Sequence, residues 1–458
     1  MESLTINRKT INVLMFPWLA HGHISPYLEL AKRLTHRNFT IHLCSTPANL
    51  SSIKHKIGKK FARSIRLVEL HLPSLPNGTY LPPCYHTTNG LPPELMPKLK
   101  HAFDISKPEF STILQSIKPD LLIYDFLQPW APLIASQHKI PAVEFITSSS
   151  TMVAYMFHFF AERPVSEFPG HDTINFREYE YVHRDALLSS DERVRINAFE
   201  GVHRSNEIVL IKGFREIEGE YIDYLSQLLG KKIVPVGPLV QNPSHEHESS
   251  KIIDWLDEKG KCSTVYVSFG SEYFLEQEDL NELALGLELS NVNFIWIVRF
   301  PKGEKKVVLK EALPLGFLER VEKRGLVIEG WAPQAQILMH GNVGGFVSHC
   351  GCSSMMESMR FGVPIIAMPM HLDQPLNARL VEKIGVGVEV VRGSLGKLEK
   401  EEVAAVIRRV VVEGGGENVR ENARRMSEKI RGKGDEEIDE VVQQLVKICN
   451  TKLVNGFH

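Results

Sequence analysis

Residues 331–374 contain, in this order, an aromatic ring, a turn of small residues, a carboxylate, and a carboxylate beside an amide. Trp331 offers a flat face on which a base can stack, an interaction worth roughly 1 to 3 kcal/mol. Glu357 is of the type that accepts hydrogen bonds from ribose hydroxyls in dinucleotide-binding folds. Asp373 and Gln374 supply acceptors and donors for sugar hydroxyls. The order of these side chains predicts a site for a nucleotide sugar.

The small residues between these side chains predict a seat for a diphosphate. An apolar run at 344–348 is typical of a buried strand, and residues 355–361 have helical character before Pro364 prevents continuation. The turn Gly351–Ser354 would lead the strand into the helix, where backbone N–H groups and the positive end of the helix dipole favour an anion. We expect the Ser353 and Ser354 hydroxyls to act as additional donors.

The segment from Trp331 to Gln374 resembles the signature segment of the plant family-1 UDP-dependent glycosyltransferases in its length, its first residue and its last pair. The resemblance implies that Trp331 stacks on uracil and that His349 and the small residues after it hold the diphosphate. Gln at position 374 implies UDP-glucose as donor, whereas His there accompanies UDP-galactose. The donor-binding residues that the resemblance implies are Ser271, Trp331, Ala332, Gln334, His349, Gly351, Cys352, Ser353, Ser354, Glu357, Asp373 and Gln374.

The chain departs from the family pattern at one place. After His-Cys-Gly the family has Trp-Asn-Ser, whereas this chain has Cys352, Ser353 and Ser354. An indole and a carboxamide are therefore missing beside the phosphates and the sugar. The departure motivates one alternative, a UDP-sugar-binding protein with impaired catalysis, although the presence of His23 and Asp125 argues against it.

His23 is the candidate general base. It lies between the predicted strand Ile11–Phe16 and a helix whose expected N-cap is Ser25 and whose expected first residue is Pro26. Just before a helix N-terminus, the positive dipole disfavours imidazolium and keeps the ring a neutral base. The resemblance places the family's catalytic histidine at His23. His21 is the other candidate, and the pair could also bind a metal, although the spacing suggests no third ligand.

Asp125 is the candidate partner of His23, because it follows the predicted strand 121–124, where an α/β sheet presents side chains to its crevice. A carboxylate on the far nitrogen of His23 would fix the tautomer and stabilise the imidazolium. The resemblance implies this role, whereas the residue type alone fits equally well a surface Asp that caps the next segment. The mechanism implied is a single inverting displacement, in which His23 deprotonates an acceptor hydroxyl.

No metal or other cofactor is expected, and UDP-glucose enters as a substrate. The chain contains no Asp-x-Asp pair of the kind that clamps a diphosphate through a metal. Ser271 follows a predicted strand and matches the family's hydroxyl contact to phosphate, but it also fits a plain turn serine. Cys350 and Cys352 are too few for structural zinc and too closely spaced for the usual redox motif.

The elements that must position these residues have the pattern of an α/β protein, with apolar runs alternating with amphipathic segments in each half. The resemblance implies the GT-B fold, two facing Rossmann-like doubly wound domains with the active site in the cleft between them. We expect residues 1–240 to bind the acceptor, 241–250 to be a linker, and 251–458 to bind the UDP-sugar, with the last helix able to pack back on the first domain. The expected strands are 11–16, 40–44, 121–124, 208–211, 265–269, 294–298, 327–328, 345–348 and 364–367.

Composition limits the partners. The chain has 458 residues, 43% of them hydrophobic, which is enough for two domains with separate cores. A net charge of −2 without a basic stripe disfavours nucleic acid. The N-terminus lacks a signal peptide and no run reaches a membrane span, so a cytoplasmic protein with reduced cysteines is expected. We expect a monomer that binds a UDP-sugar and a small-molecule acceptor, either a glycoside or an aglycone.

The acceptor is the least defined feature. Residues 152–160 are rich in aromatics and methionine, which fits a packed helix or an acceptor wall. The segments 86–92 and 215–221 resemble those of the branch-forming subgroup, which adds sugar to a sugar on a flavonoid or terpenoid glycoside. A direct aglycone O-glucosyltransferase remains the alternative. A nicotinamide-dependent oxidoreductase is disfavoured, because no strand is followed by Gly-x-Gly-x-x-Gly.

Overall fold

A computed structural model describes residues 10–76, 80–188, 192–241, 250–270, 273–300, 308–393, 395–433 and 435–455. The chain divides into two compact units. Unit 1 comprises residues 1–150, 190–239 and 435–458, and unit 2 comprises residues 151–189 and 240–434. The predicted linker 241–250 falls mainly on residues 242–249, which lie outside the described residues.

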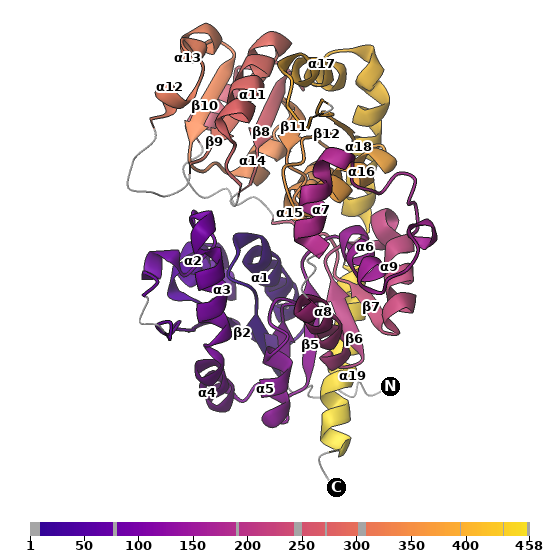
Figure 1. The fold of residues 1–458 in the computed structure, drawn as a ribbon. Helices are drawn as coiled ribbons and strands as arrows, with labels where there is room; N and C mark the ends of the chain where they lie inside the picture. Colours follow the sequence, from indigo (N-terminus) through magenta and orange to yellow (C-terminus); the bar gives the residue numbers. More distant parts are fainter. Residues whose placement is uncertain are drawn as a thin grey trace, which may run out of the picture. The chain divides into compact units, whose positions relative to one another are not determined.

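Unit 1 contains a sheet flanked by helices (Figure 1). The sheet has seven strands in the order β3-β2-β1-β4-β5-β6-β7, and every neighbouring pair is parallel. Its strands are β1 Ile11–Phe16, β2 Phe39–Ser45, β3 Ile65–Glu69, β4 Leu121–Tyr124, β5 Ala142–Ile146, β6 Ile208–Ile211 and β7 Lys232–Pro235. Its helices are α1 His21–Thr35, α2 Pro47–Phe61, α3 Met96–Asp104, α4 Lys107–Ile117, α5 Ala131–Gln137, α8 Glu192–Arg204, α9 Arg215–Leu229 and α19 Glu436–Asn455.

Unit 2 contains a six-stranded sheet of order β10-β9-β8-β11-β12-β13, also parallel throughout. Its strands are β8 Thr264–Ser268, β9 Asn293–Val298, β10 Gly325–Glu329, β11 Val343–Ser348, β12 Ile365–Ala367 and β13 Gly387–Glu389. Its helices are α6 Ser150–Phe160, whose first residue is the last of unit 1, α7 Tyr181–Leu188, α10 Ser250–Asp257, α11 Gln277–Ser290, α12 Leu309–Ala312, α13 Phe317–Val321, α14 Gln334–Met339, α15 Cys352–Phe361, α16 Gln374–Lys383, α17 Lys400–Val411 and α18 Glu417–Gly432. The prediction of two Rossmann-like α/β halves is confirmed.

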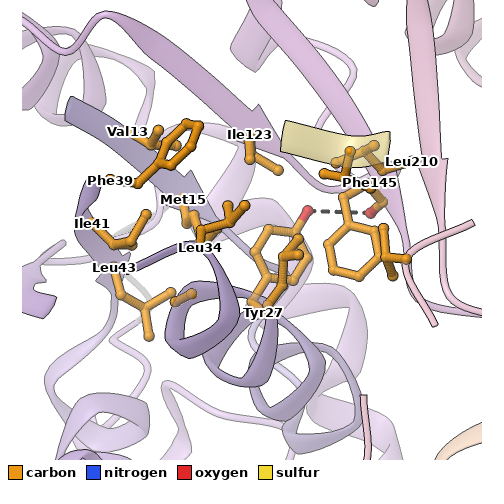
Figure 2. Packing of buried hydrophobic residues seen from close by; sticks show 14 of the residues in the cluster. Val13, Met15, Tyr27, Leu34, Phe39, Ile41, Leu43, Ile123, Phe145 and Leu210 are labelled. Atoms are coloured by element: carbon orange, nitrogen blue, oxygen red, sulfur yellow. Dashed lines mark hydrogen bonds between the residues drawn. The ribbon is translucent and has the colours of Figure 1, made fainter. Parts of the chain in front are cut away.

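The central strands consist of apolar runs, because both faces of a parallel sheet are buried by helices. In unit 1 the helix α1 turns Tyr27 and Leu34 onto β1 and β2, and the Tyr27 hydroxyl donates to the Phe145 carbonyl at 3.2 Å (Figure 2). The same core contains Val441 and Leu445 of α19, the last helix of the chain. Burial of each such side chain contributes about 1.5 to 3 kcal/mol.

All nine predicted strands exist, with ends that differ by at most two residues. Four strands were not predicted, namely β3, β5, β7 and β13. β3, β7 and β13 lie at sheet edges, where a strand can be short and charged, and the apolar run of β5 is interrupted by Glu144.

The predicted start of α1 is wrong. The helix begins at His21, with Ala20 at the N-cap, so Pro26 lies inside the helix and His23 lies within its first turn. The Ala20 carbonyl accepts the N–H groups of both His23 and Ile24 at 3.0 Å, which nucleates the turn ahead of the Ser-Pro signal. Ser25 uses its hydroxyl to contact His21 Nδ1 at 3.1 Å instead of capping the helix.

The predicted small-residue turn is also shorter than expected. Gly351 is the N-cap of α15, and Cys352, Ser353 and Ser354 form the first turn of that helix.

Within the described part of the chain, no helix is both long and apolar enough to cross a membrane.

Candidate functional site

His23 and Asp125 meet in unit 1, as the sequence predicts. His23 Nδ1 lies 2.7 Å from Asp125 Oδ2, with side-chain exposures of 18% and 0%. His23 is in the first turn of α1, and Asp125 follows β4, which is the sheet neighbour of β1. The carboxyl ends of adjacent parallel strands lie at one edge of the sheet, and this topology brings the two side chains together.

The Asp125 carboxylate is held by backbone groups as well as by His23. The Trp18 N–H donates to Oδ2 at 3.3 Å, and the Leu127 N–H donates to Oδ1 at 3.2 Å. These donors stabilise a carboxylate that is fully buried. With the carboxylate on Nδ1, the proton of a neutral His23 resides on Nδ1, and Nε2 becomes the proton acceptor.

Thr147 was not predicted to take part. Its hydroxyl lies 3.1 Å from His23 Nδ1, and it directly follows β5, the strand beside β4. A position directly after a strand could have marked Thr147 as a candidate site residue, but the strand that precedes it, β5, was not predicted. Thr147 and Asp125 therefore confine the same imidazole nitrogen.

A second carboxyl group lies on β5 beside this pair. Glu144 is paired in register with Tyr124, is 1% exposed, and has no partner for Oε2 among the described residues. Burial, followed by the negative charge of Asp125, raises the pKa of Glu144 to about 8. Glu144 is therefore mostly uncharged at neutral pH.

The predicted nucleoside contacts lie in unit 2. Gln334 is the first residue of α14, and its Nε2 donates to Glu357 Oε2 at 2.7 Å and to Ser354 Oγ at 3.2 Å. Tyr266 donates from its hydroxyl to Gln334 Oε1 at 3.5 Å. The Gln334 amide therefore connects Ser354 and Glu357, so that residues predicted to contact the nucleoside, the phosphate and the ribose lie together. Tyr266 also contacts this amide and was not predicted.

Trp331 and Ala332 precede α14. The Trp331 side chain is 65% exposed, which leaves a face accessible to a stacking partner, whereas Ala332 is buried. Arg299 donates from Nε to the Gly330 carbonyl at 2.8 Å, next to Trp331. Ser271, predicted to contact the phosphate, lies outside the described residues.

The predicted diphosphate seat is the crossing from β11 to α15. Cys352, Ser353 and Ser354 follow the N-cap Gly351 as the first residues of α15. The N-terminus of a helix favours an anion through its backbone N–H groups and its dipole. The half-buried His349 precedes this turn. Burial, followed by the proximity of His371, lowers the pKa of His349 to about 4, so its ring is neutral.

Two glycines make room for the His349 ring. A Cβ on Gly351 would lie 2.5 Å from His349 Nε2, and one on Gly270 would lie 2.8 Å from the same atom. Gly270 also has a φ of +77°, which L side chains rarely adopt. Both neighbours of the imidazole must therefore be glycine for the ring to keep this position.

Asp373 and Gln374 lie at the start of α16. Gln374 is buried, and its Oε1 accepts the N–H groups of Met370 at 3.0 Å and His371 at 3.2 Å. Asp373 is the N-cap and accepts from Asn377 Nδ2 at 3.0 Å.

The Cys350 thiol is buried, which raises its pKa and disfavours a thiolate. Among the described residues, no group of three or more His, Cys, Asp or Glu side chains is placed to hold a metal ion.

Two family models match the chain. Residues 9–241 match "Glycosyltransferase, N-terminal domain", and residues 228–442 match "UDP-glucoronosyl and UDP-glucosyl transferase". A Glycyrrhiza uralensis UGT complexed with glycyrrhetinic acid 3-O-monoglucuronide has the same fold, with a TM-score of 0.84, 22% identity and 98% of each chain covered.

Relatives with higher identity span nearly the whole chain. A mogroside IIIx synthase of Siraitia grosvenorii is 52% identical, covering 95% of this chain and 93% of its own length. UDP-glucosyltransferase 29 of Panax ginseng is 53% identical, with 96% and 98% covered. A β-D-glucosyl crocetin β-1,6-glucosyltransferase of Gardenia jasminoides is 51% identical, with 95% and 98% covered. The chain therefore belongs to the plant family-1 UDP-dependent glycosyltransferases and is a UDP-glycosyltransferase of the GT-B fold class.

Proposed function

We propose that this enzyme transfers glucose from UDP-glucose to a sugar hydroxyl of a small plant glycoside, such as a terpenoid glycoside, with inversion at the anomeric carbon. The observation that carries the proposal is the 2.7 Å pairing of His23 Nδ1 with a buried Asp125, because it leaves Nε2 to act as a base. Relatives named for glucosyl transfer, including one named for a glucosyl crocetin, support a glycoside acceptor.

In the proposed reaction, His23 Nε2 takes the proton of the acceptor hydroxyl as the oxygen forms a bond to the anomeric carbon. The bond from that carbon to the UDP oxygen breaks, and UDP leaves as the anion. Asp125 holds the far nitrogen and stabilises the imidazolium. Base assistance of this kind contributes on the order of 100- to 10,000-fold.

The leaving UDP is held by unit 2 in this proposal. Trp331 stacks on uracil, Ala332 and Gln334 contact the nucleoside, and Glu357 binds the ribose. His349, Gly351 and the first turn of α15, Cys352 to Ser354, bind the diphosphate with Ser271 as a further donor. Asp373 and Gln374 bind the glucose.

The geometry sharpens the role of Gln374. Since its Oε1 already accepts two backbone N–H groups, its Nε2 is the atom that remains to donate to a glucose hydroxyl. Asp373 supplies the acceptor.

The test is an assay in which UDP-glucose is incubated with matched pairs of an aglycone and its monoglucoside, with products read by mass and the anomeric configuration by NMR. The expected product is the diglucoside with inverted configuration, formed equally well in the presence of a chelator. Product from the aglycone alone would assign a direct aglycone transferase. Thermal stabilisation by UDP-glucose without any product would assign a sugar-binding protein with impaired catalysis.

A further inference from the structure

Asn377 lies one turn into α16 and is fully buried. Its Nδ2 donates to the Cys350 carbonyl at 2.9 Å and to Asp373 Oδ2 at 3.0 Å. An amide nitrogen carries two protons, so both are used by these two bonds. Asn377 is not part of the signature segment, which ends at Gln374.

The two acceptors belong to different parts of the donor site. Cys350 lies between His349 and Gly351, on the crossing from β11 to α15, and has a φ of +61°. Asp373 lies at the start of α16, next to Gln374. The Asn377 amide therefore joins the backbone of the proposed diphosphate seat to a side chain of the proposed glucose-binding pair.

We propose that Asn377 is a positioning residue that fixes the glucose-binding pair relative to the diphosphate seat and thereby sets the discrimination between UDP-sugars. The inference rests on the donor roles proposed above for Asp373 and Gln374. UDP-sugars that differ only at one hydroxyl share the nucleotide contacts, so they are distinguished by where the residues that bind the sugar lie. A displacement of about 1 Å in such a position can cost on the order of 100-fold in rate.

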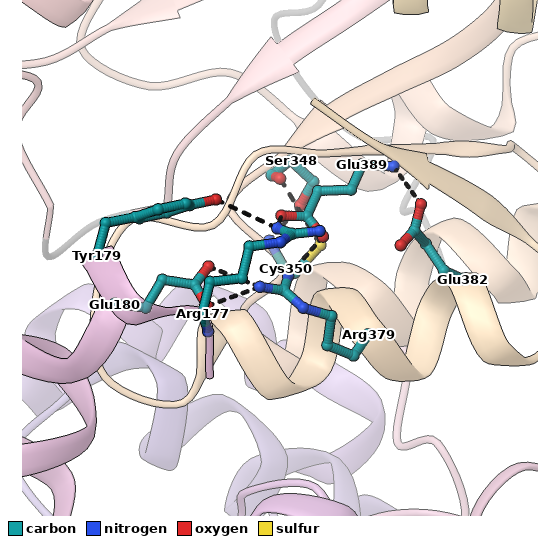
Figure 3. A network of polar contacts seen from close by, with 8 residues as sticks. All are labelled: Arg177, Tyr179, Glu180, Ser348, Cys350, Arg379, Glu382 and Glu389. Atoms are coloured by element: carbon teal, nitrogen blue, oxygen red, sulfur yellow. Dashed lines mark hydrogen bonds and ion pairs between the residues drawn. The ribbon is translucent and has the colours of Figure 1, made fainter. Parts of the chain in front are cut away.

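The helix α16 is anchored by ionic contacts that do not involve Asn377. Arg379, on the next part of the helix, donates to Glu180 Oε1 and Oε2 at 2.8 and 2.6 Å and to Glu389 Oε2 at 2.5 Å (Figure 3). Residues two positions apart point to different faces of a helix. Loss of the Asn377 amide should therefore release the Cys350 carbonyl and Asp373 without removing the ionic contacts that anchor the helix.

The experiment compares Asn377→Ala with Asn422→Ala. Asn422 is a matched control on α18, because its Nδ2 also donates to the carbonyl of a left-handed residue, Gly385, at 3.1 Å in the same unit. For each variant, kcat/KM is measured with UDP-glucose and UDP-galactose, together with the Kd of UDP. Asn377→Asp replaces the donor by a carboxylate, and Asn377→Ser keeps a single donor should the Ala variant not fold.

For Asn377→Ala, we expect kcat/KM with UDP-glucose to fall about tenfold and the preference over UDP-galactose to fall at least about threefold, with the Kd of UDP within about twofold. The Ser variant should lie between Ala and wild type, and Asn377→Asp should lose more than Ala. Asn422→Ala should leave the preference unchanged. An equal loss with both donors in the Asn377 variants would overturn the inference alone, whereas wild-type protein inert with both donors would overturn the proposed function and the inference with it.

Discussion

Two crossings from a parallel strand to a helix carry the proposed chemistry, and they use the same topology for opposite purposes. In unit 1, β1 leads into α1, whose first turn contains His23. In unit 2, β11 leads into α15, whose first turn contains Cys352 and two serines. Each crossing lies at the carboxyl end of a central strand, where α/β folds bind their ligands.

The difference lies in what reaches each helix end from the neighbouring strands. At α1 a buried carboxylate, Asp125, fixes the imidazole and can stabilise its protonated form. Neither helix has an acidic residue in its first turn, and at α15 the nearby His349 is held neutral by burial. With the roles proposed above, topology supplies the location of each site, whereas the first-turn residues and the flanking strand ends determine whether the site is suited to a proton or to an anion.

The largest effect expected from breaking the comparison is that of His23→Ala. Without the base, kcat should fall on the order of 100- to 10,000-fold, while stabilisation by UDP should persist because its proposed contacts lie in unit 2. The assay is initial rate with UDP-glucose, alongside a thermal shift with UDP. His21→Ala, two residues away in the same turn, is the control and should keep most of the activity. Near-normal turnover by His23→Ala would contradict its role as the base.

Asp125→Ala should have the next largest effect, on the order of 100-fold in kcat, because Asp125 orients His23 but does not take the proton. The removed carboxylate also leaves the Trp18 N–H without an acceptor it now uses. Rates and melting temperatures should be measured together, so that lost folding is not mistaken for lost catalysis. A loss larger than that of His23→Ala in a folded variant would be incompatible with a purely orienting role.

Gly351→Ala probes the unit 2 crossing. The added Cβ would lie 2.5 Å from His349 Nε2, so the ring or the start of α15 must shift, and UDP affinity should fall roughly tenfold. Gly341→Ala is the control, because a Cβ there meets nothing within 4 Å. Calorimetric titration with UDP measures the effect. Unchanged UDP affinity in Gly351→Ala would remove the crossing from the donor site.

The smallest effect is expected from Cys352→Trp, which restores the residue of the family pattern. The indole adds a flat surface beside the proposed donor, so selectivity among UDP-sugars should tighten by less than about tenfold. Cys352 is 8% exposed, so the melting temperature must be followed to detect overpacking. If neither the rate nor the ranking of UDP-sugars changes, position 352 contributes only packing.

Much of the arrangement could be predicted because it depends on local patterns. The central strands are continuous apolar runs. Asp125 comes directly after one of them, β4, and the segment 331–374 contains two others, β11 and β12. The start of α1 could not be predicted, since the Ser-Pro signal at Ser25 competes with a turn that begins four residues earlier. Three of the four edge strands, β3, β7 and β13, were missed because they are too short and too charged to have a clear period.

The sequence alone determined the family and the two α/β halves, and it predicted the proposed base and its partner, because each depends on residue types at fixed positions. Only the tertiary structure decided which atoms of those residues are available. It brings the Thr147 hydroxyl to His23 Nδ1, and it makes the side-chain oxygen of Gln374 accept a backbone N–H group. It also connects the Cys350 carbonyl to Asp373 through the Asn377 amide. Such contacts join residues that lie on separate strands and helices, and their geometry arises from the packing of the sheet and not from any local pattern.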